Sequence, residues 1–89
     1  MLQEVQESCY QTANAHLANE NYYSAMELFK DLRGYKDSPA HLEIAQEGLY
    51  QQAIEHYHNK EYSDAKTLFY FLGNYKDSDY YEQYIRENY

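Results

Sequence analysis

Apolar residues recur at spacings of three and four along most of the chain, as they do in helices that bury one face. The first segment of this kind carries Leu2, Val5, Cys9, Ala13 and His16. Further along the chain, the same pattern returns with Leu42, Ala45, Leu49, Ala53 and His56. No alternating run is long enough to predict a β-strand. The pattern therefore predicts an all-α protein.

A shorter helix is predicted after each of two polar turns, Asn19-Glu20-Asn21 and Asn59-Lys60-Glu61. The apolar face of this helix carries Tyr22, Ala25, Leu28, Phe29 and Leu32 in one place, and Tyr62, Ala65, Leu68, Phe69 and Leu72 in the other. We expect the two helices to close at Gly34 and Asn74, because glycine and asparagine tolerate the left-handed conformation of a C-cap.

The chain is a tandem repeat. Displaced by 40 residues, residues 1–49 align without a gap on residues 41–89, and 18 of the 49 pairs are identical. We expect a single domain with one copy over 1–40, a second over 41–80, and a partial third copy or capping helix over 78–89. This organisation predicts about five helices arranged as antiparallel hairpins.

The helix that joins the two copies has a clear predicted start. Ser38 is a candidate N-cap, and Pro39 would take the first helical position, where its missing N–H costs nothing. The Asp37 carboxylate would favour the positive end of the helix dipole. From Pro39 the helix would continue to His58.

The residues that recur also carry a resemblance to a known family. They are Ala13, Tyr22, Ala25, Phe29 and Leu32 with the Asn-Glu-Asn-Tyr turn, and their counterparts in the second copy. Each copy resembles a tetratricopeptide repeat, of a divergent bacterial variety with a longer period and a repeated Tyr-Lys-Asp-Ser element. The resemblance implies that the hairpins stack as a short right-handed α-solenoid whose concave face is lined by the first helix of each copy.

That resemblance implies a partner-binding face. Its positions in this chain are Glu7, Tyr10, Asn14, Leu17, Glu47, Tyr50, Ile54 and Tyr57. The basic clamp of chaperone-binding relatives has no counterpart here, because Glu7, Tyr10 and Gln51 stand in its place. The alternative is that these tyrosines pack against a neighbouring copy or a second chain.

Composition narrows the class of partner. The chain has 89 residues, a net charge of −8, 13 tyrosines and no tryptophan. This charge disfavours direct contact with nucleic acid or an anionic membrane and favours a basic or basic-apolar protein segment. A single cysteine and the lack of a signal-peptide pattern or an apolar spanning run favour a cytoplasmic protein, or the cytoplasmic part of a larger one.

The sequence offers little support for catalysis or for a bound metal or cofactor. The histidines have no recognised ligand spacing, so we interpret them as packed side chains, and Cys9 aligns with an apolar position. Tyr-Lys-Asp-Ser is interpreted as structural, with tyrosine in the seam and Asp and Ser capping the next helix. We expect no enzyme activity, no metal and no cofactor.

Three functions remain open. The first is a protein-interaction or scaffold module that binds a protein segment on a concave face lined by tyrosines, either as a domain capped by the 78–89 helix, as a homodimer or within a longer repeat array. The second is an acidic mimic of nucleic acid that inhibits an enzyme with a basic cleft. The third is a passive oligomerisation module of a larger protein.

Overall fold

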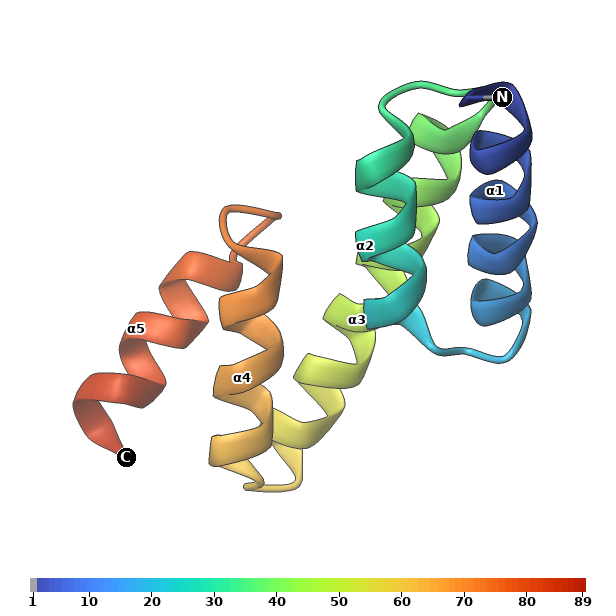
Figure 1. Ribbon diagram of the computed structural model, residues 1–89. Coiled ribbons are helices and arrows are strands. Elements are labelled where there is room, and N and C mark those ends of the chain that lie inside the picture. Colours follow the sequence, from blue (N-terminus) through green and yellow to red (C-terminus); the bar gives the residue numbers. More distant parts are fainter. Residues whose placement is uncertain (1) are drawn as a thin grey trace. The chain divides into compact units, whose positions relative to one another are not determined.

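The computed structural model describes residues 2–89, with side chains described from Val5 onward. It contains five helices, namely α1 (Leu2–Ala18), α2 (Tyr22–Leu32), α3 (Ser38–His58), α4 (Tyr62–Leu72) and α5 (Ser78–Asn88) (Figure 1). Within these residues there is no strand, so the predicted all-α class is confirmed. The stacking of the helices into a solenoid stays a prediction.

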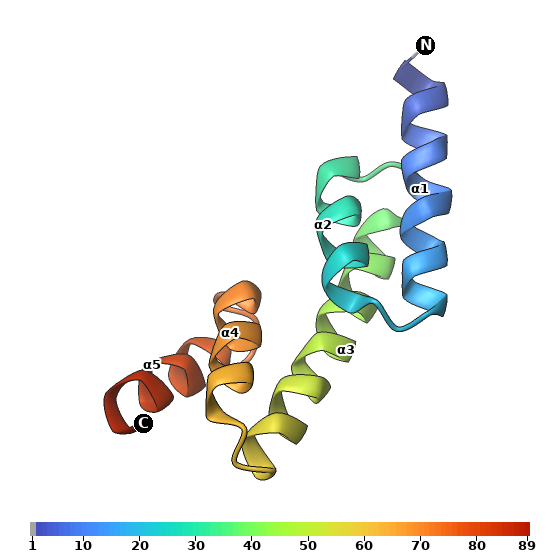
Figure 2. The same cartoon turned by 60° about the horizontal axis from the view of Figure 1, so that its bottom comes forward.

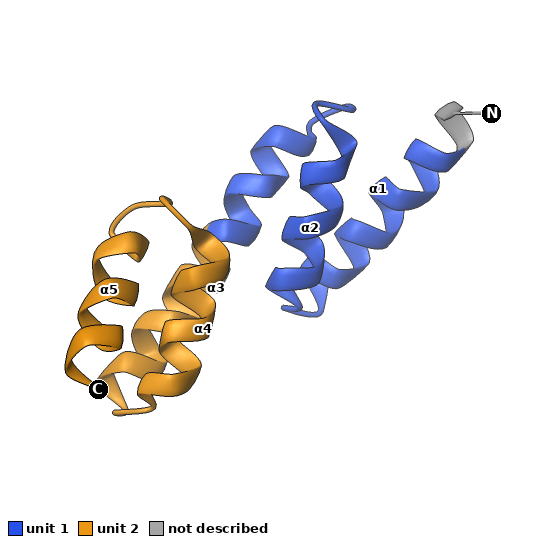
Figure 3. Cartoon of the chain, turned by 60° about the vertical axis from the view of Figure 1, so that its left-hand side comes forward, with its two compact units in different colours: residues 1–46 blue, residues 47–89 orange. Residues whose placement is uncertain are grey.

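The chain forms two compact units, residues 1–46 and residues 47–89 (Figure 3). In the first unit, α1 and α2 lie side by side and antiparallel, and α4 and α5 do the same in the second (Figures 1 and 2). Helix α3 contributes its first residues to one unit and the rest to the other. The expected division into copies over 1–40, 41–80 and 78–89 stays a prediction.

Small residues let the helices of each unit approach closely. Ala13 and Ala25 are fully buried in the first unit, and Ala53 and Ala65 are fully buried in the second. Larger apolar side chains complete the two cores, namely Met26, Phe29 and Leu32 in the first unit and Leu49, Phe69, Leu72 and Ile85 in the second. The spacing of apolar residues therefore identified most of the buried face of each helix.

The start of α1 departs from that pattern. Val5 is 58% exposed and Cys9 is only half-buried, although their counterparts Ala45 and Leu49 are buried. Helix α1 has 17 residues and α2 has 11, so α2 is too short to cover the whole of α1. The predicted burial of Val5 and Cys9 is therefore wrong, and the side chain of Leu2 lies outside the described residues.

The helices that follow the Tyr-Lys-Asp-Ser element start differently from the prediction. Helices α3 and α5 already include Ser38 and Ser78, and the N-cap of α5 is Asp77. The carbonyl of Asp37 accepts from the N–H groups of Ala40 and His41. Ser38 is therefore the first helical residue rather than the cap. Both serine hydroxyls are buried without a hydrogen-bond partner.

The C-caps of α2 and α4 lie one residue earlier than predicted. Arg33 caps α2 with a φ of 49°, and Gly73 caps α4 with a φ of 62°. Gly34 also has a positive φ, whereas Asn74 does not. The chain thus turns out of α2 with an arginine in the left-handed region, where a side chain is strained.

Candidate functional site

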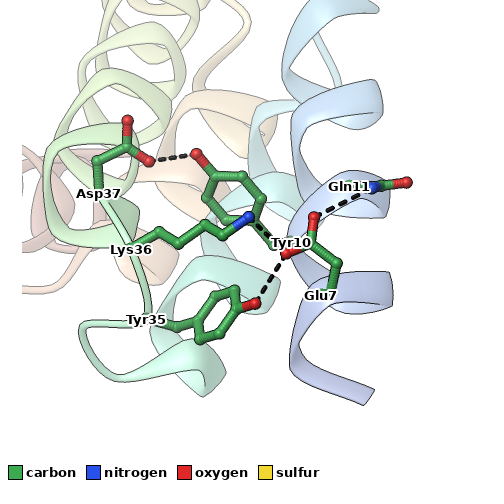
Figure 4. A network of polar contacts seen from close by, with 6 residues as sticks. All are labelled: Glu7, Tyr10, Gln11, Tyr35, Lys36 and Asp37. Atoms are coloured by element: carbon green, nitrogen blue, oxygen red, sulfur yellow. Dashed lines mark hydrogen bonds and ion pairs between the residues drawn. The ribbon is translucent and has the colours of Figure 1, made fainter. Parts of the chain in front are cut away.

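The first Tyr-Lys-Asp-Ser element folds back onto Glu7 of α1. The Tyr35 hydroxyl donates a hydrogen bond of 2.7 Å to the Glu7 carboxylate, and the Lys36 ammonium lies 2.5 Å from the same oxygen (Figure 4). The Gln11 amide donates to the other oxygen at 3.0 Å. One carboxylate therefore anchors the loop that leads from α2 to α3.

Two aromatic rings complete the surroundings of Lys36. We call this lysine, its partner Glu7 and the rings of Tyr10 and Tyr35 a lysine site. The Lys36 Nζ atom lies 5.2 Å from the centre of the Tyr10 ring and 5.5 Å from the centre of the Tyr35 ring. These rings pack edge to face, 5.9 Å apart. Both distances to the lysine are within the range of cation–π attraction.

The far side of Tyr10 is also occupied. Its hydroxyl donates to the Asp37 carboxylate, and its ring stacks on His41. The His41 imidazole contacts the Asn14 amide oxygen at 2.7 Å and Asp37 at 3.2 Å. The side-chain oxygen of Asn14 therefore already has a partner within its own unit.

The second unit builds the same lysine site. Glu47 accepts from the Tyr75 hydroxyl and from the Gln51 amide, each at 2.8 Å, and it pairs with Lys76. The Lys76 Nζ atom lies 5.3 Å from the Tyr50 ring and 5.6 Å from the Tyr75 ring. Residues 40 positions apart thus make the same contacts in both units.

The pKa of the glutamate is lowered in the same way in both lysine sites. The hydrogen bond from Lys36, helped by that from Tyr35, lowers the pKa of Glu7 from 4.5 to about 2. The hydrogen bond from Lys76, helped by that from Gln51, lowers the pKa of Glu47 from 4.5 to about 2. In turn, the hydrogen bond to Glu7 raises the pKa of Lys36. Both carboxylates are held in their charged form by local contacts, which supports a structural role for the tyrosine and lysine of Tyr-Lys-Asp-Ser.

The eight predicted partner-binding residues are all half-buried. Four lie in the first unit (Glu7, Tyr10, Asn14 and Leu17) and four in the second (Glu47, Tyr50, Ile54 and Tyr57). Glu7, Tyr10, Asn14, Glu47 and Tyr50 belong to the lysine sites and their surroundings described above. Because the eight residues are divided between two units, a face that they share stays a prediction.

Tyr57 belongs instead to a ring of tyrosines within the second unit. Six side chains form a closed circuit of ring-to-ring contacts, and we call them the tyrosine surface: Tyr57, Tyr62, Tyr89, Tyr84, Tyr80 and Tyr81. Successive ring centres are between 3.8 and 6.3 Å apart. Burial, followed by the nearby Tyr84 and Tyr89 hydroxyls, raises the pKa of Tyr57.

Much of this surface faces solvent. Tyr80 is 66% exposed, Tyr84 38% and Tyr89 65%. Tyr81 is half-buried, because its ring stacks on Phe69 of the core at 4.8 Å. The surface is therefore anchored in the core on one side and exposed on the other.

The fold does not require tyrosine at most of these positions. Forty residues earlier, the counterparts of the six tyrosines are Leu17, Tyr22, Leu49, Ile44, Ala40 and His41. Only one of the six is a tyrosine, yet these residues also lie in helices. The sequence prediction included Tyr57 but not the other five, because it took its positions from the resemblance to tetratricopeptide repeats. The five differences would have been the better guide.

Two shallow hollows adjoin the tyrosine surface. One is lined by Tyr80, Gln83, Tyr84, Glu87 and Asn88. The other is lined by Tyr62, Ser63, Lys66, Ile85, Arg86 and Tyr89. The first hollow thus carries a carboxylate, whereas the second carries two cationic side chains.

One histidine lies among acidic groups. His56 contacts Glu61 at 2.8 Å, and Asp64 completes a group whose candidate ligand atoms lie within 4.8 Å of one another. Sequence spacing missed this group because the turn between α3 and α4 brings it together. Both carboxylates are exposed, and Glu61 and Asp64 lie at the cap and first turn of α4, where acidic side chains offset the helix dipole. We therefore interpret the group as part of a helix start.

Comparison of the chain with protein-family models, with curated proteins and with solved structures gives no match. The resemblance to tetratricopeptide repeats accordingly stays a hypothesis from the sequence. Among the described helices, none combines the length and apolar character needed to cross a membrane.

Proposed function

We propose that this protein is a non-catalytic interaction module that binds a segment of another protein. The observation that carries the proposal is the tyrosine surface of the second unit. Tyrosine is well suited to this role, because it offers a large, stiff contact area with a polar tip and loses little conformational entropy on binding. Tyr57 links the tyrosine surface to the face proposed from the repeat resemblance.

The comparison between the two copies supports a role in binding. A residue needed for the helical hairpin should recur, as Ala13, Ala25 and Phe29 do in Ala53, Ala65 and Phe69. Five tyrosines of the surface do not recur, and three of them are exposed. Aromatic residues concentrated at an exposed face are typical of interfaces between proteins.

We further propose a basic or basic-apolar segment as the partner, in keeping with the net charge of −8. The free cysteine favours a reducing compartment, so we propose a cytoplasmic location. Mimicry of nucleic acid by the same surface is an outcome that the following experiment separates.

A library of random peptides displayed on phage would be selected on immobilised protein. The matched control replaces three tyrosines with the residues of the earlier copy, namely Tyr57→Leu, Tyr80→Ala and Tyr84→Ile, which keeps the net charge. We expect peptides to be enriched on the wild type and not on the control variant, at low and at high salt. Equal enrichment on both proteins, or capture that disappears in salt as expected for a nucleic-acid mimic, would contradict the proposal.

A further inference from the structure

The chain contains two internal examples of how it holds a lysine side chain. In each, two tyrosine rings and one glutamate surround the ammonium group. The glutamate is Glu7 for Lys36 and Glu47 for Lys76. A carboxylate combined with aromatic faces suits a cation, because the charge is paired while the ring quadrupoles add attraction.

The same glutamate occurs a third time. Glu87 follows Glu47 by 40 residues, just as Glu47 follows Glu7. It is exposed near the end of α5 and lines the first hollow together with Tyr80 and Tyr84. The two tyrosine rings stack 6.2 Å apart, with 20° between their planes. Two rings and a carboxylate thus line one hollow, from different tyrosine positions and with stacked rings in place of the edge-to-face rings of the lysine sites.

The surroundings of Glu87 differ from those of Glu7 and Glu47 in the cationic side chains that lie close by. Among the residues with described side chains, the lysines that lie over tyrosine rings are Lys36 and Lys76, and each is bound to its own glutamate. The neighbouring Arg86 pairs with Glu82 at 3.9 Å. Gln83 approaches Glu87 at 3.4 Å, a long contact between a neutral donor and a carboxylate.

We propose that Glu87, Tyr80 and Tyr84 form a subsite for a lysine or arginine side chain of the partner segment. This inference rests on the proposed function, since it names the chemistry that the tyrosine surface selects. Glu87 pairs with the cation, and the exposed parts of Tyr80 and Tyr84 contact its apolar stem and its charge. Arginine suits the subsite particularly well, because a guanidinium stacks on aromatic faces and binds a carboxylate through two N–H groups.

The second hollow sets a direction for the bound segment. It contains Lys66 and Arg86, which would repel a cationic side chain. The cation of the partner is therefore placed on the Tyr84 side of the surface, while a neutral or acidic part of the segment lies toward Tyr62 and Tyr89.

Fluorescence anisotropy with two defined peptides tests this subsite. One probe is a leucine-rich peptide with a single arginine near one end, and its counterpart has citrulline, a neutral isostere, in place of that arginine. We expect the wild type to bind the arginine peptide about tenfold more tightly than the citrulline peptide. Glu87→Gln should remove most of that preference, whereas Glu55→Gln, an exposed site on α3 with the same change in charge, should retain it.

A Tyr80→Ala/Tyr84→Ile variant completes the experiment. Its new residues are those of Ala40 and Ile44 in α3, so circular dichroism should show unchanged helix content. We expect this variant to bind both peptides more weakly, with a larger loss for the arginine peptide.

Three other results of this binding experiment would each contradict a specific claim. Equal affinity for the two peptides, with both lost in the tyrosine variant, would overturn the cation subsite and leave the proposed function in place. Unchanged binding by the tyrosine variant would overturn the subsite and contradict the use of this surface. Failure of the wild type to bind the arginine peptide would also overturn the subsite, while the proposed function would still be decided by the display selection.

Discussion

The buried hydroxyls of Ser38 and Ser78 predict that replacing either serine by alanine stabilises the protein. The capping role predicted from the sequence implies the opposite, a loss of stability. An N-cap serine replaced by alanine costs about 1 kcal/mol of stability, because a helix N–H loses its partner. In this structure the two serines lie inside the helix starts, and their hydroxyls are fully buried without a hydrogen-bond partner. We therefore expect Ser38→Ala and Ser78→Ala to stabilise the protein.

The size of the effect follows from three contributions. A buried hydroxyl without a hydrogen bond costs about 1–3 kcal/mol in proteins, and this cost disappears in the alanine variant. Alanine also favours a helix over serine by about 0.5 kcal/mol. Loss of the oxygen atom removes packing contacts worth about 0.5 kcal/mol in total. The last two contributions cancel, so the net expectation is a gain of about 1–3 kcal/mol for each substitution.

Urea unfolding and thermal unfolding, each followed by circular dichroism, measure this gain. A stabilisation of 1 kcal/mol corresponds to a rise of about 4–8 °C in the melting temperature of a domain of this size. Ser8→Ala is the control, since Ser8 is exposed in α1 and its replacement changes only helix propensity. A loss of stability in Ser38→Ala or Ser78→Ala would refute the reasoning and restore the capping role predicted from sequence.

Three further predictions concern stability. The pKa of Glu7 and of Glu47 is about 2 against an ordinary 4.5, so their contribution to stability is complete above pH 4.5 and disappears as the pH falls toward 2. Glu7→Gln/Glu47→Gln should lower the urea midpoint at neutral pH and flatten its fall below pH 4.5; a wild-type curve that is already flat there would contradict the lysine sites. Arg33→Gly should stabilise by about 1 kcal/mol in thermal unfolding because it relieves a left-handed arginine, whereas the same change at Arg86 within α5 should destabilise. Ala53→Leu should destabilise by about 1–3 kcal/mol through overpacking, and an equal loss from Ala18→Leu at an exposed position would argue against that cause.

Much of the fold could be predicted from the sequence, because apolar spacing reports which helix face is buried. Ala25 and Phe29 in α2, and Ala65 and Phe69 in α4, were identified in this way and are buried. The spacing says less about helix ends and coverage. Val5 has the correct periodicity but lies on a part of α1 that the shorter α2 does not cover.

The candidate site was harder to predict, because its contacts connect residues far apart in the chain. Nothing in the spacing of Glu7 and Lys36 indicates that they pair, and a helix start with Asp followed by Ser favours the serine as cap. In the structure, the Ser38 hydroxyl is instead buried without a hydrogen-bond partner, and the tyrosine and lysine of the element anchor the loop. The tyrosine surface, in contrast, could have been found from the residues that differ between the two copies.

The most direct test is to map the bound peptide by NMR. On titration with the arginine peptide, we expect backbone amide shifts to change over residues 80–88 and around Tyr57 and Tyr62, and we expect Glu87→Gln to need about tenfold more peptide for the same changes. Changes concentrated instead over the earlier counterparts, residues 40–48, Leu17 and Tyr22, or spread evenly along the acidic chain, would contradict binding at the tyrosine surface.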